Sequence, residues 1–250
     1  MRALTYERRR LTSVRSTWLV LFAALAVNAV IAAVTVRQPA LATPVRVLTA
    51  GVPLLPLPVA ALGAGAVGAL SYGHEVRYPV LNPLLLPIRR RLGLLIAKIV
   101  VIGLFSALLA AATLTLDAAV YSAVLHRTPP LLPALAGFVA LVVTGGWIGL
   151  LASALLRSAA AGALVLLTLP VLVEPAVTAL RAVLAGEGLR LPHRQALFPV
   201  GSGRAWLYGP LSGLHNSDQL SPRGLLLLIA GPVLILLLGY LVLLPRRRGI

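Results

Sequence analysis

The chain of 250 residues contains no cysteine and only six acidic residues. The absence of cysteine excludes disulfides, cysteine-ligated zinc, iron–sulfur clusters and thiol nucleophiles. Charged residues make up 11% of the chain, whereas soluble domains carry roughly 25%. This scarcity of charge excludes an ordinary soluble globular domain.

Motifs for hydrolysis and metal binding are also missing. No Walker P-loop and no G-x-S-x-G element occurs in the sequence. His74 and Glu75 begin like the zinc motif H-E-x-x-H, but Tyr78 stands where the second histidine is required. His193 and His215 share an outer segment with Asp218, at a spacing that matches no known ligand pattern. We therefore expect no catalytic residue, no metal and no cofactor.

One apparent nucleotide motif has a structural explanation. Residues 63–68 read G-A-G-A-V-G, which matches the dinucleotide pattern G-x-G-x-x-G. That site needs a preceding strand and a soluble βαβ unit, whereas this run lies inside an apolar stretch. Small residues in such a stretch favour close helix packing, and Gly145 and Gly149 form a second face of this kind.

Apolar residues dominate what the chain does contain. They make up 59% of it, with a mean hydropathy of +0.97. A helix needs about 20 apolar residues to cross the roughly 30 Å hydrocarbon layer. Apolar stretches of that size, each with at most one charged residue, cover residues 18–36, 48–72, 94–116, 132–156, 159–180 and 224–244. The predicted fold class is an all-α integral membrane protein with six transmembrane helices.

We expect a single transmembrane domain over residues 1–250. Its parts are an interfacial helix over 1–16, spans one to five within 17–180, an extracytoplasmic segment over 181–223, span six over 224–245 and a tail over 246–250. In the interfacial helix, Leu4, Leu11 and Val14 share one helical face, so this amphipathic helix is predicted to lie on the cytoplasmic lipid surface.

The net charge of +16 comes from 22 basic residues, and their placement predicts the orientation. Fourteen lie on the side of the two termini and eight on the other side. The positive-inside rule then places both termini in the cytoplasm. Because the basic groups lie between long apolar runs, nucleic acid is not an expected partner.

Three polar residues lie within or beside the predicted spans. Asn28 lies near the midplane of span one, where it most simply hydrogen-bonds a neighbouring helix. Asp117 follows Lys98 by 19 residues, about 28 Å along a helix. This spacing favours a charge at the opposite membrane interface, and the same interpretation applies to Glu174. The alternative is that Asn28, Asp117 and Glu174 are polar groups of a substrate pathway.

A charged segment between spans two and three carries a family resemblance. Residues 73–77 read G-H-E-V-R, Pro87 opens a P-x-x-R element, and Ala97-Lys98 heads span three. The amino end adds S-V-R-S-T-W over residues 13–18, after Glu7 in a basic helix; L-L-R-S over 155–158 and L-P-R-R-R over 244–248 fit the same order. In this order of motifs the chain resembles the permease subunits of ABC type-2 exporters.

The resemblance implies a permease subunit that exports an amphipathic or hydrophobic substrate across the bacterial cytoplasmic membrane. Such a chain is no enzyme itself; its partners would be separate ABC ATPase subunits, a second permease chain in a homo- or heterodimer, and the lipid bilayer. The docking contact to the ATPase would be Glu75, Arg77, Arg89 and Arg90, and Trp206 and Tyr208 would form an outer gate.

Two other functions stay open from the sequence. One is a non-transporting membrane anchor or sensor subunit. The other is a membrane-embedded lipid-processing enzyme using Asp117, Glu174 or the outer histidines. The arginines at 89–91 also have a simpler interpretation as topology determinants bound to anionic lipid.

Overall fold

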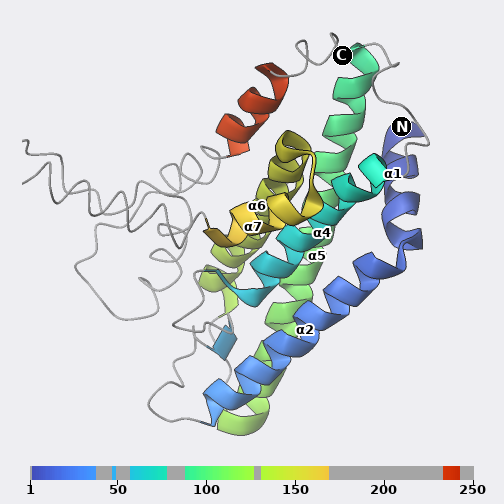
Figure 1. Cartoon of the computed structure of the whole chain (residues 1–250). Coiled ribbons are helices and arrows are strands. Elements are labelled where there is room, and N and C mark those ends of the chain that lie inside the picture. The colour runs from blue at the N-terminus through green and yellow to red at the C-terminus, as the bar shows by residue number, and fades with distance from the viewer. Residues whose placement is uncertain are drawn as a thin grey trace, which may run out of the picture.

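The computed structural model describes residues 2–37, 47–48, 57–77, 88–126, 131–168 and 233–242, and this part of the chain is helical without any strand (Figure 1). The helices are α1 (Arg2–Ser13), α2 (Arg15–Val36), α4 (Val59–Arg77), α5 (Ile88–Leu125), α6 (Leu131–Leu156) and α7 (Ala159–Thr168), followed by Val233–Val242.

Three of these helices are long and apolar enough to cross a membrane. Their apolar parts are Arg15–Val36, Gly93–Leu125 and Phe138–Leu156, and shorter apolar helices cover Val59–Gly73 and Val233–Val242. An all-helical membrane protein is thus supported. Six spans stay a prediction, because much of the last two predicted spans lies outside the described residues.

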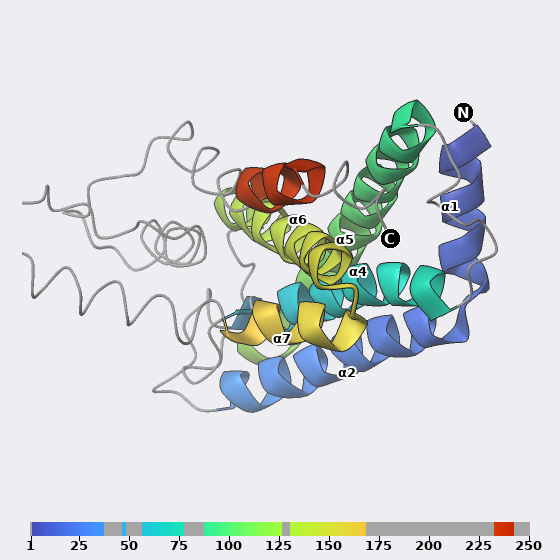
Figure 2. The same cartoon turned by 45° about the horizontal axis from the view of Figure 1, so that its top comes forward.

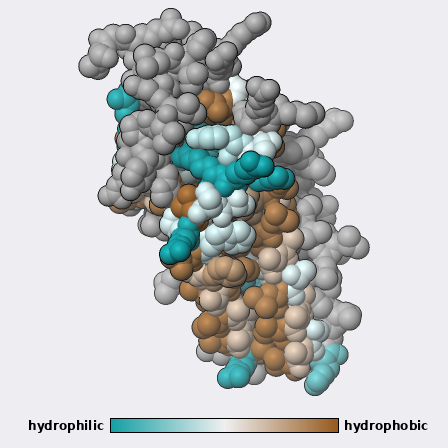
Figure 3. Space-filling model, turned by 90° about the vertical axis from the view of Figure 1, so that its right-hand side faces the viewer, coloured by the Kyte–Doolittle hydropathy of each residue, from teal (hydrophilic) through white to brown (hydrophobic). Residues whose placement is uncertain are grey.

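The apolar side chains are divided between a core and an outer surface. The core includes Phe138, Ile102 and Leu150, all fully buried. Phe22 on α2 and Leu108 on α5 are about 60% exposed, and large apolar side chains along both helices are exposed with them. Figure 3 shows hydrophobic residues over the middle of one face, with hydrophilic groups toward its two ends. A surface of this composition fits lipid rather than water.

Helix α4 lies at the centre of the bundle and packs against α2, α5, α6 and α7 (Figures 1 and 2). Its contact with α6 is backbone to backbone. A Cβ added at Gly149 would overlap the carbonyl oxygen of Gly65, and one added at Gly68 would overlap that of Gly146. The two small-residue faces of the sequence therefore pack against each other, as the close-packing interpretation predicts.

Helix α1 turns away from the axis of α2 at Val14, which is extended at φ −87° and ψ 116° (Figure 2). The indole N–H of Trp18 donates to the carbonyl oxygen of Thr12 at 2.8 Å, which satisfies a group in the last turn of α1. Leu11 is buried against the bundle while Leu4 is 44% exposed. The predicted apolar face of this helix thus does not lie wholly on the lipid surface: Leu11 packs against protein, whereas Leu4 is exposed.

Two helix boundaries differ from the predicted spans. Helix α4 begins at Val59, directly after Pro58, and continues to Arg77. Helix α5 runs from Ile88 to Leu125, well beyond residue 116. The predicted span three ends just before Asp117, whereas α5 continues through this residue, whose carboxyl group accepts a hydrogen bond from Asn28.

Candidate functional site: buried polar contacts between helices

A buried hydrogen bond joins α2 to α5. Nδ2 of Asn28 donates to Oδ2 of Asp117 at 2.6 Å, and both side chains are fully buried. The expectation that Asn28 bonds a neighbouring helix is confirmed. The carboxyl group of Asp117 is enclosed between helices eight residues before the end of α5, so it is not an exposed charge; its position relative to the membrane interface stays a prediction.

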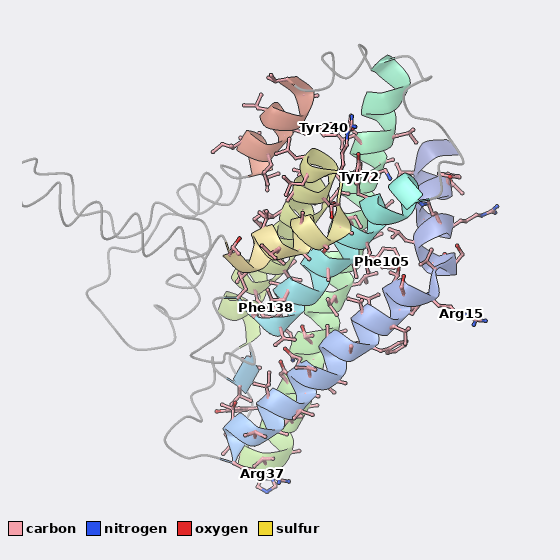
Figure 4. The ribbon with its side chains drawn as sticks, viewed as in Figure 1. Arg15, Arg37, Tyr72, Phe105, Phe138 and Tyr240 are labelled. Atoms are coloured by element: carbon pink, nitrogen blue, oxygen red, sulfur yellow. The ribbon has the colours of Figure 1, made fainter. Side chains whose placement is uncertain are left out.

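The position of the Asn28–Asp117 pair along α2 can be measured from the two ends of that helix. Arg15 and Arg37 are exposed and point outward at opposite ends of the helix (Figure 4). Asn28 lies thirteen residues after Arg15 and nine before Arg37, which is about 20 Å and 14 Å along the axis. The pair therefore lies inside the predicted hydrocarbon layer, somewhat nearer to the Arg37 end.

The pair leaves two hydrogen-bond acceptors open. Within the part of the chain that the structure describes, no donor reaches Oδ1 of Asn28 or Oδ1 of Asp117. Thr113 is buried one turn before Asp117, but its hydroxyl donates to the carbonyl oxygens of Leu109 and Ala110 on its own helix. The described residues also supply no basic partner to Asp117.

A second buried cluster fastens α1 to the rest of the bundle. Oε1 of Glu7 lies 3.4 Å from Nζ of Lys98 on α5 and 3.4 Å from Nη1 of Arg10. Nη2 of Arg10 donates to the carbonyl oxygen of Ser71 on α4 at 2.8 Å. Glu7 and Lys98 are almost fully buried. One carboxylate and one guanidinium thus connect α1 with both α4 and α5.

Glu7 was not among the predicted site residues. In the sequence it lies among the basic residues of a predicted amphipathic helix, and its partner Lys98 is 91 positions away. A signal was nevertheless present. Lys98 is the only lysine and stands within an apolar stretch, and a buried ammonium requires an acidic partner.

The predicted docking residues lie on helix ends rather than in a loop. Glu75 and Arg77 are in the last turn of α4, and Arg89 and Arg90 are in the first turn of α5. On α4, Glu75 follows Ser71 by one turn, so the helix ends lie on the same side of the bundle as α1. Glu174, Trp206 and Tyr208 lie outside the described residues.

A further polar contact connects α6 with α5. Nε1 of Trp147 donates to the carbonyl oxygen of Ile99 at 2.9 Å. A Cβ at Gly103 would come within 3.2 Å of the same indole nitrogen. The absence of a side chain at Gly103 therefore gives the indole room to reach the α5 backbone.

The described residues contain no group of three or more His, Asp or Glu side chains that could hold a metal ion. Their polar chemistry is confined to contacts between helices, and none of these places two acids in a catalytic arrangement. No protein-family model, no curated protein and no solved structure matches the chain.

Proposed function

We propose that the chain is the membrane-spanning permease subunit of an ATP-driven exporter, with an amphipathic or hydrophobic substrate. The observation that supports this proposal best is the cluster at Glu7. It links α1 to α4 and α5. These two helices flank residues 78–87 in the sequence. Through these contacts, a movement of α1 at the cytoplasmic surface would be transmitted to the membrane helices α4 and α5.

The energy would come from a separate subunit. The sequence has no glycine-rich loop with Lys and Ser or Thr to hold the phosphates of ATP. A P-loop ATPase docked below the helix ends would supply it. Glu75, Arg77, Arg89 and Arg90 lie on the ends of α4 and α5, where such a subunit would bind.

The two alternative functions have less support. A lipid-processing enzyme needs paired catalytic groups open to its substrate, whereas Asp117 is fully buried and bonded to an amide. A passive anchor does not require a buried ion pair between its surface helix and a membrane helix. Absence of a bound ATPase would favour one of these two functions, and lipid turnover by the isolated chain would single out the enzyme.

The experiment is purification of the tagged chain in mild detergent from its native membrane, followed by identification of bound proteins and an ATPase assay. We expect a P-loop ATPase to co-purify with activity. A chain that stays ATPase-free after chemical cross-linking in the intact membrane would contradict the exporter. Turnover of a lipid by the isolated chain would favour the enzyme.

A further inference from the structure

When it is ionised, Asp117 carries a negative charge that the described residues do not compensate. Asp117 accepts one hydrogen bond from a neutral amide. A carboxylate enclosed in an apolar bundle is strongly unfavourable unless a positive charge or a proton accompanies it. The described residues supply no positive charge at Asp117, so a cation from outside the chain is one group that can compensate it.

The surroundings of the pair restrict which cation fits. Tyr121 lies one turn after Asp117 on the same face of α5 and is buried. It packs in one cluster with Ala32 and Val36, which follow Asn28 along α2. An aromatic ring and aliphatic side chains beside a carboxylate favour an organic cation with an apolar body over a hydrated metal ion.

We propose that Asp117 is the counterion for a hydrophobic organic cation that binds between α2 and α5. This inference deepens the proposed export function and rests on it for the identity of the site as a cargo site. In the structure described here the site is closed by the hydrogen bond from Asn28. Binding separates the two side chains, and the positive charge of the cargo replaces the amide as the partner of the carboxylate.

The test measures binding to the purified chain in lipid nanodiscs. Tetraphenylphosphonium is the probe and tetraphenylborate, an anion of the same shape, is its control; empty nanodiscs correct for partition into lipid. We expect saturable binding of the cation alone. Asp117→Asn should weaken it by at least roughly tenfold, since truncating one partner of a buried charge pair has effects of this size.

The matched control variant is Thr115→Ala. Thr115 is exposed two residues before Asp117, and its hydroxyl donates to the carbonyl oxygen of Ala112 in its own helix. This variant should bind the cation as the unmodified chain does. Should Asp117→Asn fail to fold, Tyr121→Leu should weaken binding severalfold while Tyr121→Phe retains it.

Three results would overturn the site: no saturable cation binding by the folded chain, equal binding of the anion, or unchanged affinity in Asp117→Asn. Because the assay contains no ATPase, it separates the two proposals. Cation binding that depends on Asp117 but without any co-purifying ATPase contradicts the exporter alone. A co-purifying ATPase with no cation binding contradicts the cation site alone.

Discussion

Single residues determine the stability of this bundle where a charge is buried. Glu7 is 1% exposed and Lys98 is 4% exposed. Each compensates the other, at an Oε1–Nζ distance of 3.4 Å. Removing one partner of such a pair leaves an uncompensated charge and is strongly destabilising, whereas replacing both by apolar residues is often tolerated.

We therefore expect Glu7→Gln to destabilise the protein by about 3 kcal/mol, because it leaves the ammonium of Lys98 buried beside a neutral amide. The double variant Glu7→Leu with Lys98→Leu should recover most of the loss. Thermal unfolding in detergent, followed by tryptophan fluorescence, measures both. Arg8→Gln, at an exposed position of the same helix, is the control. Equal melting temperatures for Glu7→Gln and Arg8→Gln would show that the ion pair contributes nothing.

At the scale of elements, the contact between α4 and α6 depends on the absence of side chains. Gly65 and Gly149 bring the two backbones together, and the carbonyl oxygen of Gly65 occupies the space of a Cβ at position 149. Because both groups belong to helix backbones, no rotamer change can relieve the overlap. The two helices would have to move apart.

This geometry predicts that Gly149→Ala destabilises the bundle although alanine is the better helix former by about 1 kcal/mol. Gly93→Ala, where a Cβ would meet nothing within 4 Å, should be neutral or slightly stabilising. The measurement is the midpoint of thermal unfolding of the two variants beside the unmodified chain. If both variants shift the midpoint in the same direction, the close approach of α4 and α6 is not what these glycines provide.

The same two elements illustrate how far the sequence predicts the fold. Small residues repeated along two apolar stretches predict close packing, because they allow a helix to approach another backbone whichever helix that is. The polar contact of Asn28 is predictable for a similar reason, since a lone amide in lipid must bond a neighbour. Its partner Asp117 is not, because a local pattern cannot distinguish a charge at an interface from one enclosed by a distant helix. Glu7 and Lys98 meet for the same non-local reason.

At the scale of the whole molecule, the exposed apolar surface predicts that α2 crosses the membrane with its ends on opposite sides. The chain has no cysteine, so single cysteines report accessibility without background. In right-side-out vesicles, an impermeant maleimide should label Arg37→Cys and should reach Thr12→Cys only after the membrane is opened. Leu104→Cys, which is 55% exposed on the apolar surface, should stay unlabelled. Labelling of residues 12 and 37 from one side would contradict a spanning α2.

The end of α4 carries Glu75, which is the proposed contact to an ATPase subunit. Glu75 lies one turn beyond Ser71, whose carbonyl oxygen accepts from Arg10, so a force applied to this turn acts directly on the helix that α1 contacts.

An acidic residue contributes little to positive-inside orientation, so Glu75→Ala should insert normally. We expect it to lower association with the ATPase or substrate export, measured by co-purification and by transport into inverted vesicles. Arg8→Ala on the exposed face of α1 controls for a general loss of surface charge. Normal association and transport by Glu75→Ala would remove this residue from the docking contact, and the arginines at the start of α5 would then be the groups to test.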